Sequence, residues 1–245
     1  MTMSLIYPDW PLQEKVVAFT TTRSGGVSQP PFDNFNLALH VSDNSSDVCE
    51  NRNRLQANVL PNTQIKWLKQ THSNIVVNAS TIEADSVEAD AAFTVDNNIA
   101  CAVLTADCLP ILLSDCNAKC IAAIHAGWRG VINGVIERTV TAMRDYAKPE
   151  YAWLGPAIGV QAFEVGDDVY AAYSQRDTQL TNTFYAKKPG KWSLDIYQAA
   201  KLVLNSADIH NVFGGEYCTY SDSDQFFSYR RQSNTGRMAT IISKR

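Results

Sequence analysis

Continuous apolar runs fill the middle of the chain, and they constrain the fold more than any other feature of the sequence. The runs lie at residues 91–95, 99–104, 111–113 and 120–124. They show no alternation of polar and apolar residues, so each strand that they predict needs apolar neighbours on both of its faces. We therefore expect these strands to lie in a sheet that is covered on both sides.

Three segments predict the main helices. Apolar residues recur at helical spacing in 131–146, which gives the clearest amphipathic pattern in the chain. The segment 193–206 has the same character, and Ser193 is its expected N-cap. A third helix is expected over 46–60, where apolar residues also share one face.

The order of strands and helices favours a mixed architecture. Two hairpins are expected, because polar turns separate 91–95 from 99–104 and 111–113 from 120–124. Further strands are predicted at 16–22, 65–68, 75–78, 151–154, 226–229 and 239–242. Strict βαβ alternation is missing, so we expect an α/β (α+β-like) fold with mixed β-sheets flanked by helices. Without a linker or repeat, residues 1–245 are predicted to form a single domain.

Charge and hydropathy limit the possible partners. The net charge is −4 and no run of Lys or Arg is present, so nucleic-acid binding is not expected. The first residues lack the basic and apolar regions of a signal peptide. The apolar runs are far shorter than the roughly 20 residues that span a bilayer. A cytoplasmic location without membrane contact is therefore expected.

Three side chains of metal-binding type stand at the ends of predicted strands: His72, Cys108 and His125. Their spacing is too long for a local zinc knuckle and suits ligands that come from separate strands. Two imidazoles and one thiolate would leave one zinc position for water or substrate, as in catalytic zinc sites. The residue types alone leave two alternatives open, namely ordinary polar residues at strand ends and a metal-free Cys108–His125 hydrolase dyad.

Three motifs carry a family resemblance. They are LKQTH at 68–72, TADCLPIL at 105–112 and HAGWRG at 125–130. They resemble the signature of the YfiH family, whose members are also labelled laccase-domain proteins, multicopper polyphenol oxidoreductases and zinc-dependent purine nucleoside phosphorylases. Further matches lie at 22–28, 36–37, 155–159, 163–166, 227–231 and 235–237. The likeness covers nearly the whole chain, and Ala38 departs from it where the family has glycine.

The resemblance implies a zinc enzyme that acts on purine nucleosides. Zinc would be held by His72, Cys108 and His125, with copper as an alternative ion in vitro. The implied reactions are phosphorolysis of adenosine, inosine, guanosine and methylthioadenosine, and deamination of adenosine. Deamination needs a carboxylate to shuttle protons, for which Asp107 and Asp90 are the candidates. Asp107 is alternatively a residue that orients a histidine ligand.

Phosphate and nucleoside need their own binding groups. Arg129 precedes the predicted 131–146 helix, and Arg23 lies in a glycine-rich loop that exposes backbone N–H groups. Within the matching segments, Asn36 and Gln70 are further candidates for binding substrate or phosphate.

Three more residues have an expected place near the site. Trp128 and Tyr229 are of a type that can stack on a purine ring. His40 follows the matching segment that begins at Asn36, which makes it a candidate to line the site, whereas His210 is expected at the surface.

The other labels of the family lead to rival functions. A multicopper oxidase needs imidazole ligands for several copper ions, and the chain has only four histidines, so laccase chemistry is not expected. A cysteine hydrolase is the main rival: an amidase acting on a peptidoglycan precursor, with the Cys108 thiolate as nucleophile and His125 as base. Some bacterial relatives are regarded as peptidoglycan editing factors. A non-catalytic scaffold is the third possibility.

Overall fold

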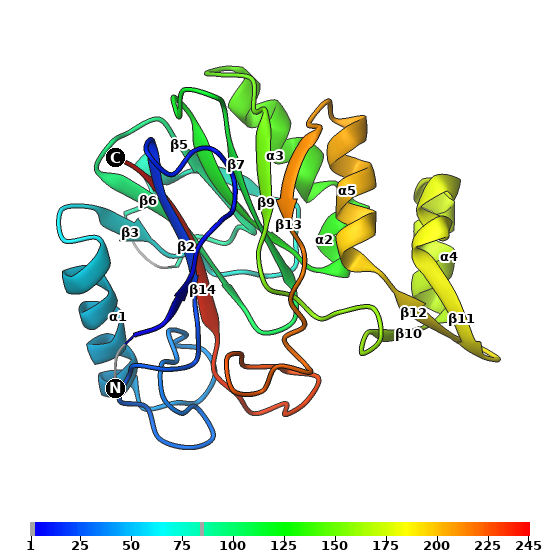
Figure 1. Cartoon of the computed structure of the whole chain (residues 1–245), viewed down its shortest axis with the longest axis horizontal. Coiled ribbons are helices and arrows are strands. Elements are labelled where there is room, and N and C mark those ends of the chain that lie inside the picture. Colours follow the sequence, from blue (N-terminus) through cyan, green and yellow to red (C-terminus); the bar gives the residue numbers. More distant parts are fainter. Residues whose placement is uncertain (1–2, 84–85) are drawn as a thin grey trace.

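Two β-sheets lie face to face at the centre of the molecule, and helices cover their outer surfaces (Figure 1). The computed structural model describes residues 3–83 and 86–245, so residues 1–2 and 84–85 of the predicted domain lie outside the described residues. The first sheet has the strand order β1-β2-β14-β6-β3. Its strands are β1 (Leu5–Ile6), β2 (Val16–Thr21), β14 (Met238–Lys244), β6 (Ile99–Thr105) and β3 (Gln64–Lys66).

The second sheet has the strand order β13-β9-β7-β8-β5-β4. Its strands are β13 (Asn211–Gly214), β9 (Tyr151–Leu154), β7 (Leu109–Ser114), β8 (Ile121–Ala126), β5 (Ala91–Thr94) and β4 (Val76–Asn78). The central pairs are antiparallel, whereas β13–β9 and β4–β5 are parallel. Mixed sheets flanked by helices confirm the predicted α/β fold class.

The two predicted hairpins have different outcomes. The β7–β8 hairpin is confirmed, with Ile111 opposite Ile124. The hairpin of 91–95 with 99–104 is wrong, because β5 pairs with β8 while β6 pairs with β14 in the other sheet. The turn at 96–98 therefore carries the chain from one sheet to the other. Both strands are apolar on two faces, and the pattern did not specify which neighbour each strand would take.

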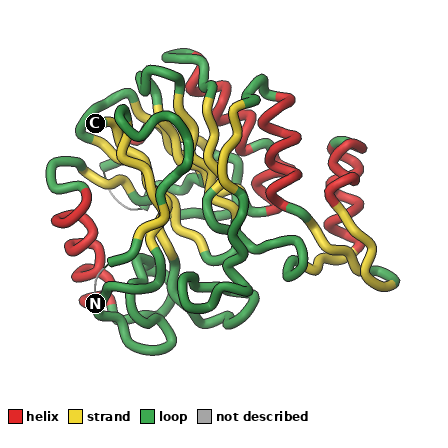
Figure 2. Tube along the Cα trace, viewed as in Figure 1, coloured by secondary structure: helices red, strands yellow, loops and turns green. Residues whose placement is uncertain are grey.

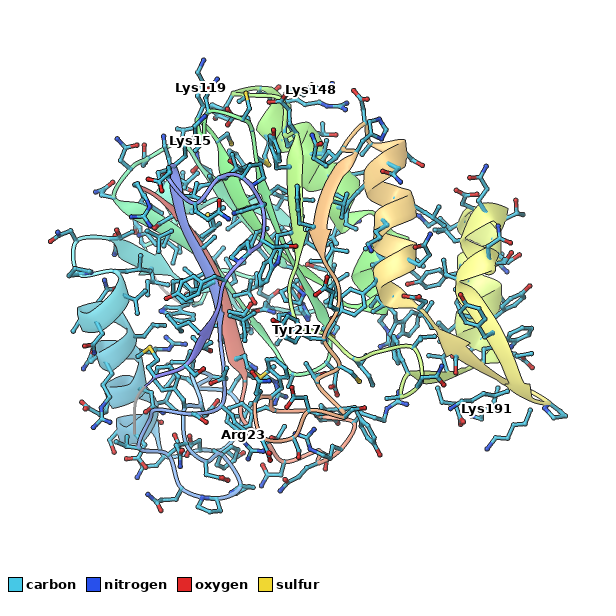
Figure 3. All side chains as sticks on the ribbon, in the orientation of Figure 1. Lys15, Arg23, Lys119, Lys148, Lys191 and Tyr217 are labelled. Carbon is cyan, nitrogen blue, oxygen red and sulfur yellow. The ribbon has the colours of Figure 1, made fainter. Side chains whose placement is uncertain are left out.

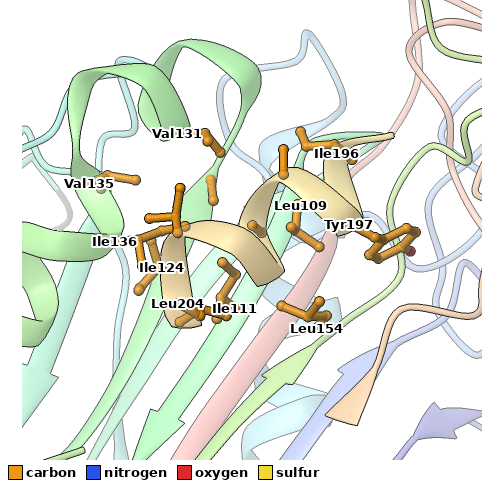
Figure 4. Close-up of a cluster of buried hydrophobic side chains, with 14 of the residues drawn as sticks. Leu109, Ile111, Ile124, Val131, Val135, Ile136, Leu154, Ile196, Tyr197 and Leu204 are labelled. Carbon is orange, nitrogen blue, oxygen red and sulfur yellow. The ribbon is translucent and has the colours of Figure 1, made fainter. Parts of the chain in front are cut away.

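Both faces of the central strands are buried, as the apolar runs predicted. On β7, Ile111 and Leu113 belong to the core under the helices, while Leu112 belongs to the core between the two sheets. Figure 4 shows the first of these cores, in which Leu109 and Ile111 of β7 lie among side chains of the covering helices, including Leu204. Each such side chain contributes roughly 1.5–3 kcal/mol when it leaves water. A third core lies on the outer face of the first sheet.

Five α-helices are described: α1 (Ser45–Val59), α2 (Trp128–Asn133), α3 (Val135–Arg144), α4 (Asp167–Arg176) and α5 (Ile196–Ser206). The single helix predicted over 131–146 is in fact α2 followed by α3. Gly134 breaks it, because its backbone is left-handed, with φ 84°. The α5 helix also starts later than predicted. Its N-cap is Asp195, which accepts the N–H of Gln198, whereas Ser193 belongs to strand β12.

An arm projects from the body, at the right of Figure 2. It consists of α4, the 3-10 helix η2 (Thr178–Thr183) and a small sheet of β10 (Glu164–Gly166), β12 (Lys191–Leu194) and β11 (Phe184–Lys188). The arm was not predicted, because most of β11 is exposed and polar and carries no apolar run. Another short 3-10 helix, η1, covers Ala79–Thr81.

The strand predicted at 226–229 is wrong, since this segment is a loop. Phe226 and Phe227 are buried against Met238 and Ala106, so aromatic packing and not strand pairing explains the apolar pattern there. Within residues 3–83 and 86–245, the helices are too short or too polar to cross a membrane.

Candidate metal centre and the cavity around it

Three separate parts of the fold bring the predicted metal ligands together. His72 lies in the loop between β3 and β4, Cys108 lies in the turn between β6 and β7, and His125 is near the end of β8. One ligand atom from each side chain lies within 4.8 Å of the others. Cys108 Sγ is 3.7 Å from His72 Nε2. The ring centroids of His72 and His125 are 4.8 Å apart, with the rings at 74° to each other.

This arrangement fits a tetrahedral metal ion. Typical Zn–S and Zn–N bonds at a tetrahedral angle place sulfur and nitrogen about 3.6 Å apart. The Cys108–His72 separation of 3.7 Å therefore leaves room for an ion bound to both atoms. Gly127 passes close by, and a Cβ at this position would lie 3.1 Å from Cys108 Sγ and 3.2 Å from His72 Cδ2. Glycine thus keeps the space between the ligands open.

A fully buried carboxylate, Asp90, holds both histidine segments. Its Oδ1 is 2.7 Å from His125 Nδ1 and accepts the backbone N–H of His72 at 3.0 Å. Its Oδ2 accepts the backbone N–H groups of Thr71 and Ser73 and the Ser73 hydroxyl. A carboxylate behind a histidine ligand fixes the orientation of the ring, which here leaves Nε2 of His125 as the nitrogen available to an ion.

Local backbone structure explains how Asp90 reaches both segments. Strand pairing places Ala91 opposite Ile124, so Asp90 lies next to His125 and its carbonyl accepts the His125 N–H at 2.7 Å. His72 has a left-handed backbone with φ 58°. This conformation lets consecutive N–H groups converge on one anion, as in a backbone nest. The hydrogen bonds offset a backbone strain of order 1–3 kcal/mol.

The site has strongly shifted pKa values. Burial would raise the pKa of Asp90, but hydrogen bonds from His125 and Ser73 lower it to about 2. Burial also raises the pKa of the Cys108 thiol, and the adjacent His125 and His72 reverse this effect and bring the pKa to about 6. Burial lowers the pKa of His125, whereas Cys108 and Asp90 raise it to about 9. At neutral pH, Cys108 is therefore a thiolate, which is the form that binds metal.

A cavity of about 510 Å³ opens onto the three ligands. This volume lies within the range of small-molecule binding sites, which is roughly 300–1,000 Å³. Its apolar wall includes Phe163 and Ile196. Three arginines also line it, namely Arg129, Arg230 and Arg237, together with His40. The cavity therefore combines an apolar wall with positively charged groups.

The other predicted site residues divide into two groups. Gln70 and Arg129 line the cavity, although both ends of the Gln70 amide bond to the backbone of Leu104. Arg129 lies within α2, not before it, and its guanidinium is 4.2 Å from the centroid of the Trp128 ring.

Arg23 and Asn36 do not line the cavity. Arg23 donates to the carbonyls of Asp33 and Ser223, and it lies among the loops at the bottom of Figure 3. Asn36 is fully buried, and its side chain accepts the backbone N–H groups of Ala38 and Arg237. The structure therefore places Arg23 and Asn36 in loop contacts outside the cavity.

Asp107 lines the cavity, but its carboxylate is engaged elsewhere. Oδ1 accepts the Thr219 hydroxyl at 2.6 Å, and Oδ2 accepts the backbone N–H of Arg230 at 2.7 Å. These bonds tie the turn that carries Cys108 to two later loops. The carboxylate that contacts a histidine ligand is Asp90.

Sequence reasoning assigned no role to Arg230 and Arg237, although both lie in segments that carry the family resemblance. Arg237 follows a loop that is distant in sequence from every metal ligand, so spacing gave no signal for it. His40 and Tyr229, which were expected near the site, do line the cavity, and Tyr229 is 57% exposed.

Comparisons with known proteins agree with this architecture. A family model described as "Multi-copper polyphenol oxidoreductase laccase" matches residues 17–245. "Purine nucleoside phosphorylase YfiH" of Escherichia coli is 44% identical over 239 residues, which is 97% of this chain and 98% of that protein. "Purine nucleoside phosphorylase" of Haemophilus influenzae is 44% identical over 245 residues, with 98% and 99% of the two chains covered.

Solved structures show the same fold. A protein from Neisseria meningitidis is similar with a TM-score of 0.94 and 40% identity, covering 100% of this chain and 99% of that one. YlmD from Geobacillus stearothermophilus is similar with a TM-score of 0.86 and 30% identity, covering 96% and 94%.

Proposed function

Because this chain belongs to the multi-copper polyphenol oxidoreductase laccase family, which includes the YfiH proteins, we propose that it is a zinc-dependent purine nucleoside phosphorylase. The proposed substrates are adenosine, inosine, guanosine and methylthioadenosine, with deamination of adenosine to inosine as a second activity. The observation that carries the proposal is the convergence of His72, Cys108 and His125 on one face of a nucleoside-sized cavity with basic side chains.

Phosphorolysis defines what the cavity has to hold. A phosphate oxygen forms a bond to C1′ of the ribose while the C1′–N9 bond to the purine breaks. The electron pair of that bond leaves with N9, and the departing base takes up the proton that hydrogen phosphate loses. The products are ribose 1-phosphate and the free base. The cavity must therefore bind an anion and a flat aromatic ring beside each other.

The lining residues of this chain match both requirements. Tyr229 and Trp128 offer aromatic surface on which a purine can stack. The basic side chains offer donors for the phosphate anion. Zinc, when bound by His72, Cys108 and His125, would supply a Lewis acid beside the substrate. Asp90 keeps the His125 ring in one orientation throughout.

The laccase label of the family is not part of this proposal. Among the described residues, His72, Cys108 and His125 form the one group of three or more potential metal ligands. His210 is exposed, 3.3 Å from Asp208, and belongs to no such group among the described residues. A set of copper ions would need more imidazole ligands than the four histidines of the chain provide.

One observation also favours a second function, that of a cysteine hydrolase. Cys108, His125 and Asp90 stand in the order of a nucleophile, a base and a group that orients the base. In amide hydrolysis, Cys108 Sγ would bond to the carbonyl carbon and the C–N bond would break. The amine would leave with a proton from His125, and water would then cleave the thioester to release the acid and restore the thiol.

Metal removal separates the two functions. Chelated and zinc-reloaded protein should be incubated with adenosine or inosine, with and without phosphate, and assayed for ribose 1-phosphate, free base and ammonia. The proposed function requires phosphate-dependent ribose 1-phosphate that disappears on chelation and returns with zinc. Adenosine converted to inosine and ammonia without phosphate would show the deaminase activity. Full amidase activity towards a peptidoglycan precursor in chelated protein would instead support the hydrolase.

A further inference from the structure

Arg237 is partly buried, whereas the other arginines of the cavity, Arg129 and Arg230, are exposed. Nη1 of Arg237 donates to the carbonyls of Thr235 and Gly236, at 2.8 and 3.0 Å. In the part of the chain that the structure describes, Nε and Nη2 donate to no protein acceptor, and no carboxylate lies within ion-pair distance of the guanidinium. A partly buried cation with free donors requires a counter-ion or water.

The free donors of Arg237 belong to the cavity that holds the metal ligands. Arg237 and Cys108 both line it, and the guanidinium lies 5.8 Å from the centroid of the Tyr229 ring. Asp107 is the one carboxylate among the lining residues, and both of its oxygens already accept hydrogen bonds from Thr219 and the Arg230 backbone. Cys108 and Asp107 interact with Arg237 electrostatically, but neither accepts a hydrogen bond from its guanidinium, so Nε and Nη2 can donate to an anion that enters the cavity.

The neighbouring loops hold Arg237 in place. Its backbone N–H donates to Asn36 Oδ1 at 3.0 Å, and its carbonyl accepts the N–H of Leu37 at 3.3 Å. Strand β14 begins at the next residue, Met238. The guanidinium thus extends from a backbone that is fixed on both sides, and this reduces the entropy lost when it binds a ligand. Asn36 was itself a candidate for binding substrate or phosphate. In the structure its side chain holds the backbone of Arg237.

The other arginines are more open to solvent. Arg230 is bonded in the same way as Arg237, with Nη1 donating to the carbonyls of Ala162 and Glu164 at 3.4 and 3.0 Å, but it is exposed, so water competes with a ligand for its remaining donors. Arg129 is also exposed and lies against the Trp128 ring. His40 also lines the cavity, and burial followed by the charge of Arg237 lowers its pKa. A neutral imidazole can still donate one hydrogen bond to an anion.

We propose that Arg237, assisted by His40, forms the phosphate subsite of this cavity. The fork of Nε and Nη2 would donate to two oxygens of one phosphate, which is the bidentate geometry that arginine provides. Phosphate bound there lies in the cavity that the metal ligands also line, where a nucleoside would present its C1′. This inference rests on the proposed phosphorylase function for its ligand.

The test compares Arg237→Met and Arg237→Lys with wild type and with Arg54→Met. Arg54 lies on α1 in an exposed pair with Glu50 and serves as the matched control. Zinc-loaded proteins are titrated with inorganic phosphate by calorimetry, without nucleoside, and are then assayed for inosine phosphorolysis. Zinc content and the melting temperature show whether each variant is folded and loaded.

If Arg237 forms the phosphate subsite, its replacement should weaken phosphate binding without a comparable change in nucleoside binding. Arg237→Met should raise the Kd and the KM for phosphate at least about tenfold, with the KM for inosine within about twofold of wild type. Arg237→Lys keeps the charge without the fork, so it should fold even if Arg237→Met does not, and should weaken phosphate binding about tenfold. Arg54→Met should match wild type in every measurement.

Failure of the subsite and failure of the function give different results. A wild-type protein that phosphorolyses inosine, with a folded Arg237→Lys variant whose phosphate KM and Kd are unchanged, would overturn the subsite and leave the function standing. A wild-type protein that binds phosphate through Arg237 but releases no ribose 1-phosphate from any nucleoside would overturn the function and support the subsite.

Discussion

Asp90 Oδ1 lies 2.7 Å from His125 Nδ1, so the one buried carboxylate that accepts the backbone N–H of the first histidine ligand also orients the ring of the second. His72 lies in the loop between β3 and β4, whereas His125 lies on β8, and Asp90 bonds to both. The relative position of the two histidines therefore depends on the Asp90 side chain.

Replacing this carboxylate should weaken metal binding without removing a ligand. We expect Asp90→Asn to lower zinc affinity by about 10- to 100-fold, the usual effect of losing such a partner. Competition with a chromophoric chelator measures the affinity. Asp208→Asn, at an exposed pair with Lys148, is the matched control and should bind zinc as wild type does. Equal affinities for both variants would contradict the role of Asp90.

The Cys108 thiol should ionise near pH 6 in chelated protein. Its pKa is lowered in the folded state, so the thiolate appears as the pH rises through this value and is lost below it. Absorbance at about 240 nm follows the thiolate, and subtraction of the Cys108→Ala signal removes the other cysteines. His125→Asn should move the midpoint up towards the ordinary value of about 8.5. A wild-type midpoint at the ordinary value would argue against the close contact with His125.

Gly127→Ala should act on the metal site more than on the fold. The added Cβ would lie 3.1 Å from Cys108 Sγ and 3.2 Å from His72 Cδ2, closer than ordinary contact allows. The ligands must then move apart, and we expect at least about tenfold weaker zinc binding, since ligand geometry sets affinity. The free energy of unfolding of the chelated protein should change by less than about 1 kcal/mol. Unchanged zinc affinity would show that the ligands adapt freely.

Gly134 should be needed for the break between α2 and α3. Its φ of 84° costs an ordinary L-residue about 1–2 kcal/mol, whereas asparagine tolerates this conformation better. Gly134→Ala should therefore lower the free energy of unfolding by about 1 kcal/mol or more, and Gly134→Asn by less. Urea denaturation of the two variants measures the difference. The opposite order of stability would refute a backbone explanation.

The sequence motifs predicted the residues of the site better than hydrophobic periodicity predicted strand pairing and helix bounds. The three metal ligands, Gln70 and Arg129 were expected from the sequence, and the structure places all of them on one cavity. Arg237 was not assigned a role, because its importance depends on which of its donors remain free. That property arises from the surrounding loops and has no counterpart in sequence spacing.

Periodicity failed where two arrangements satisfy the same pattern. The run at 99–104 is apolar on both faces and would fit beside β5 as well as beside β14. The 131–146 pattern continues through Gly134, although the backbone there leaves the helix. The buried residues of the arm, such as Val169, Tyr173 and Leu180, are scattered between polar residues and form no continuous apolar run.

Apolar runs and side-chain chemistry are local properties, so the buried strands, the mixed fold class and the three ligand-type residues could be predicted from the order of amino acids. The meeting of His72, Cys108 and His125 within 4.8 Å, and the contact of Asp90 rather than Asp107 with the histidines, result from the tertiary fold. Both depend on strand pairing between distant segments. Several registers of strand pairing would bury the same apolar side chains. The packing of the whole molecule therefore selects the register that forms.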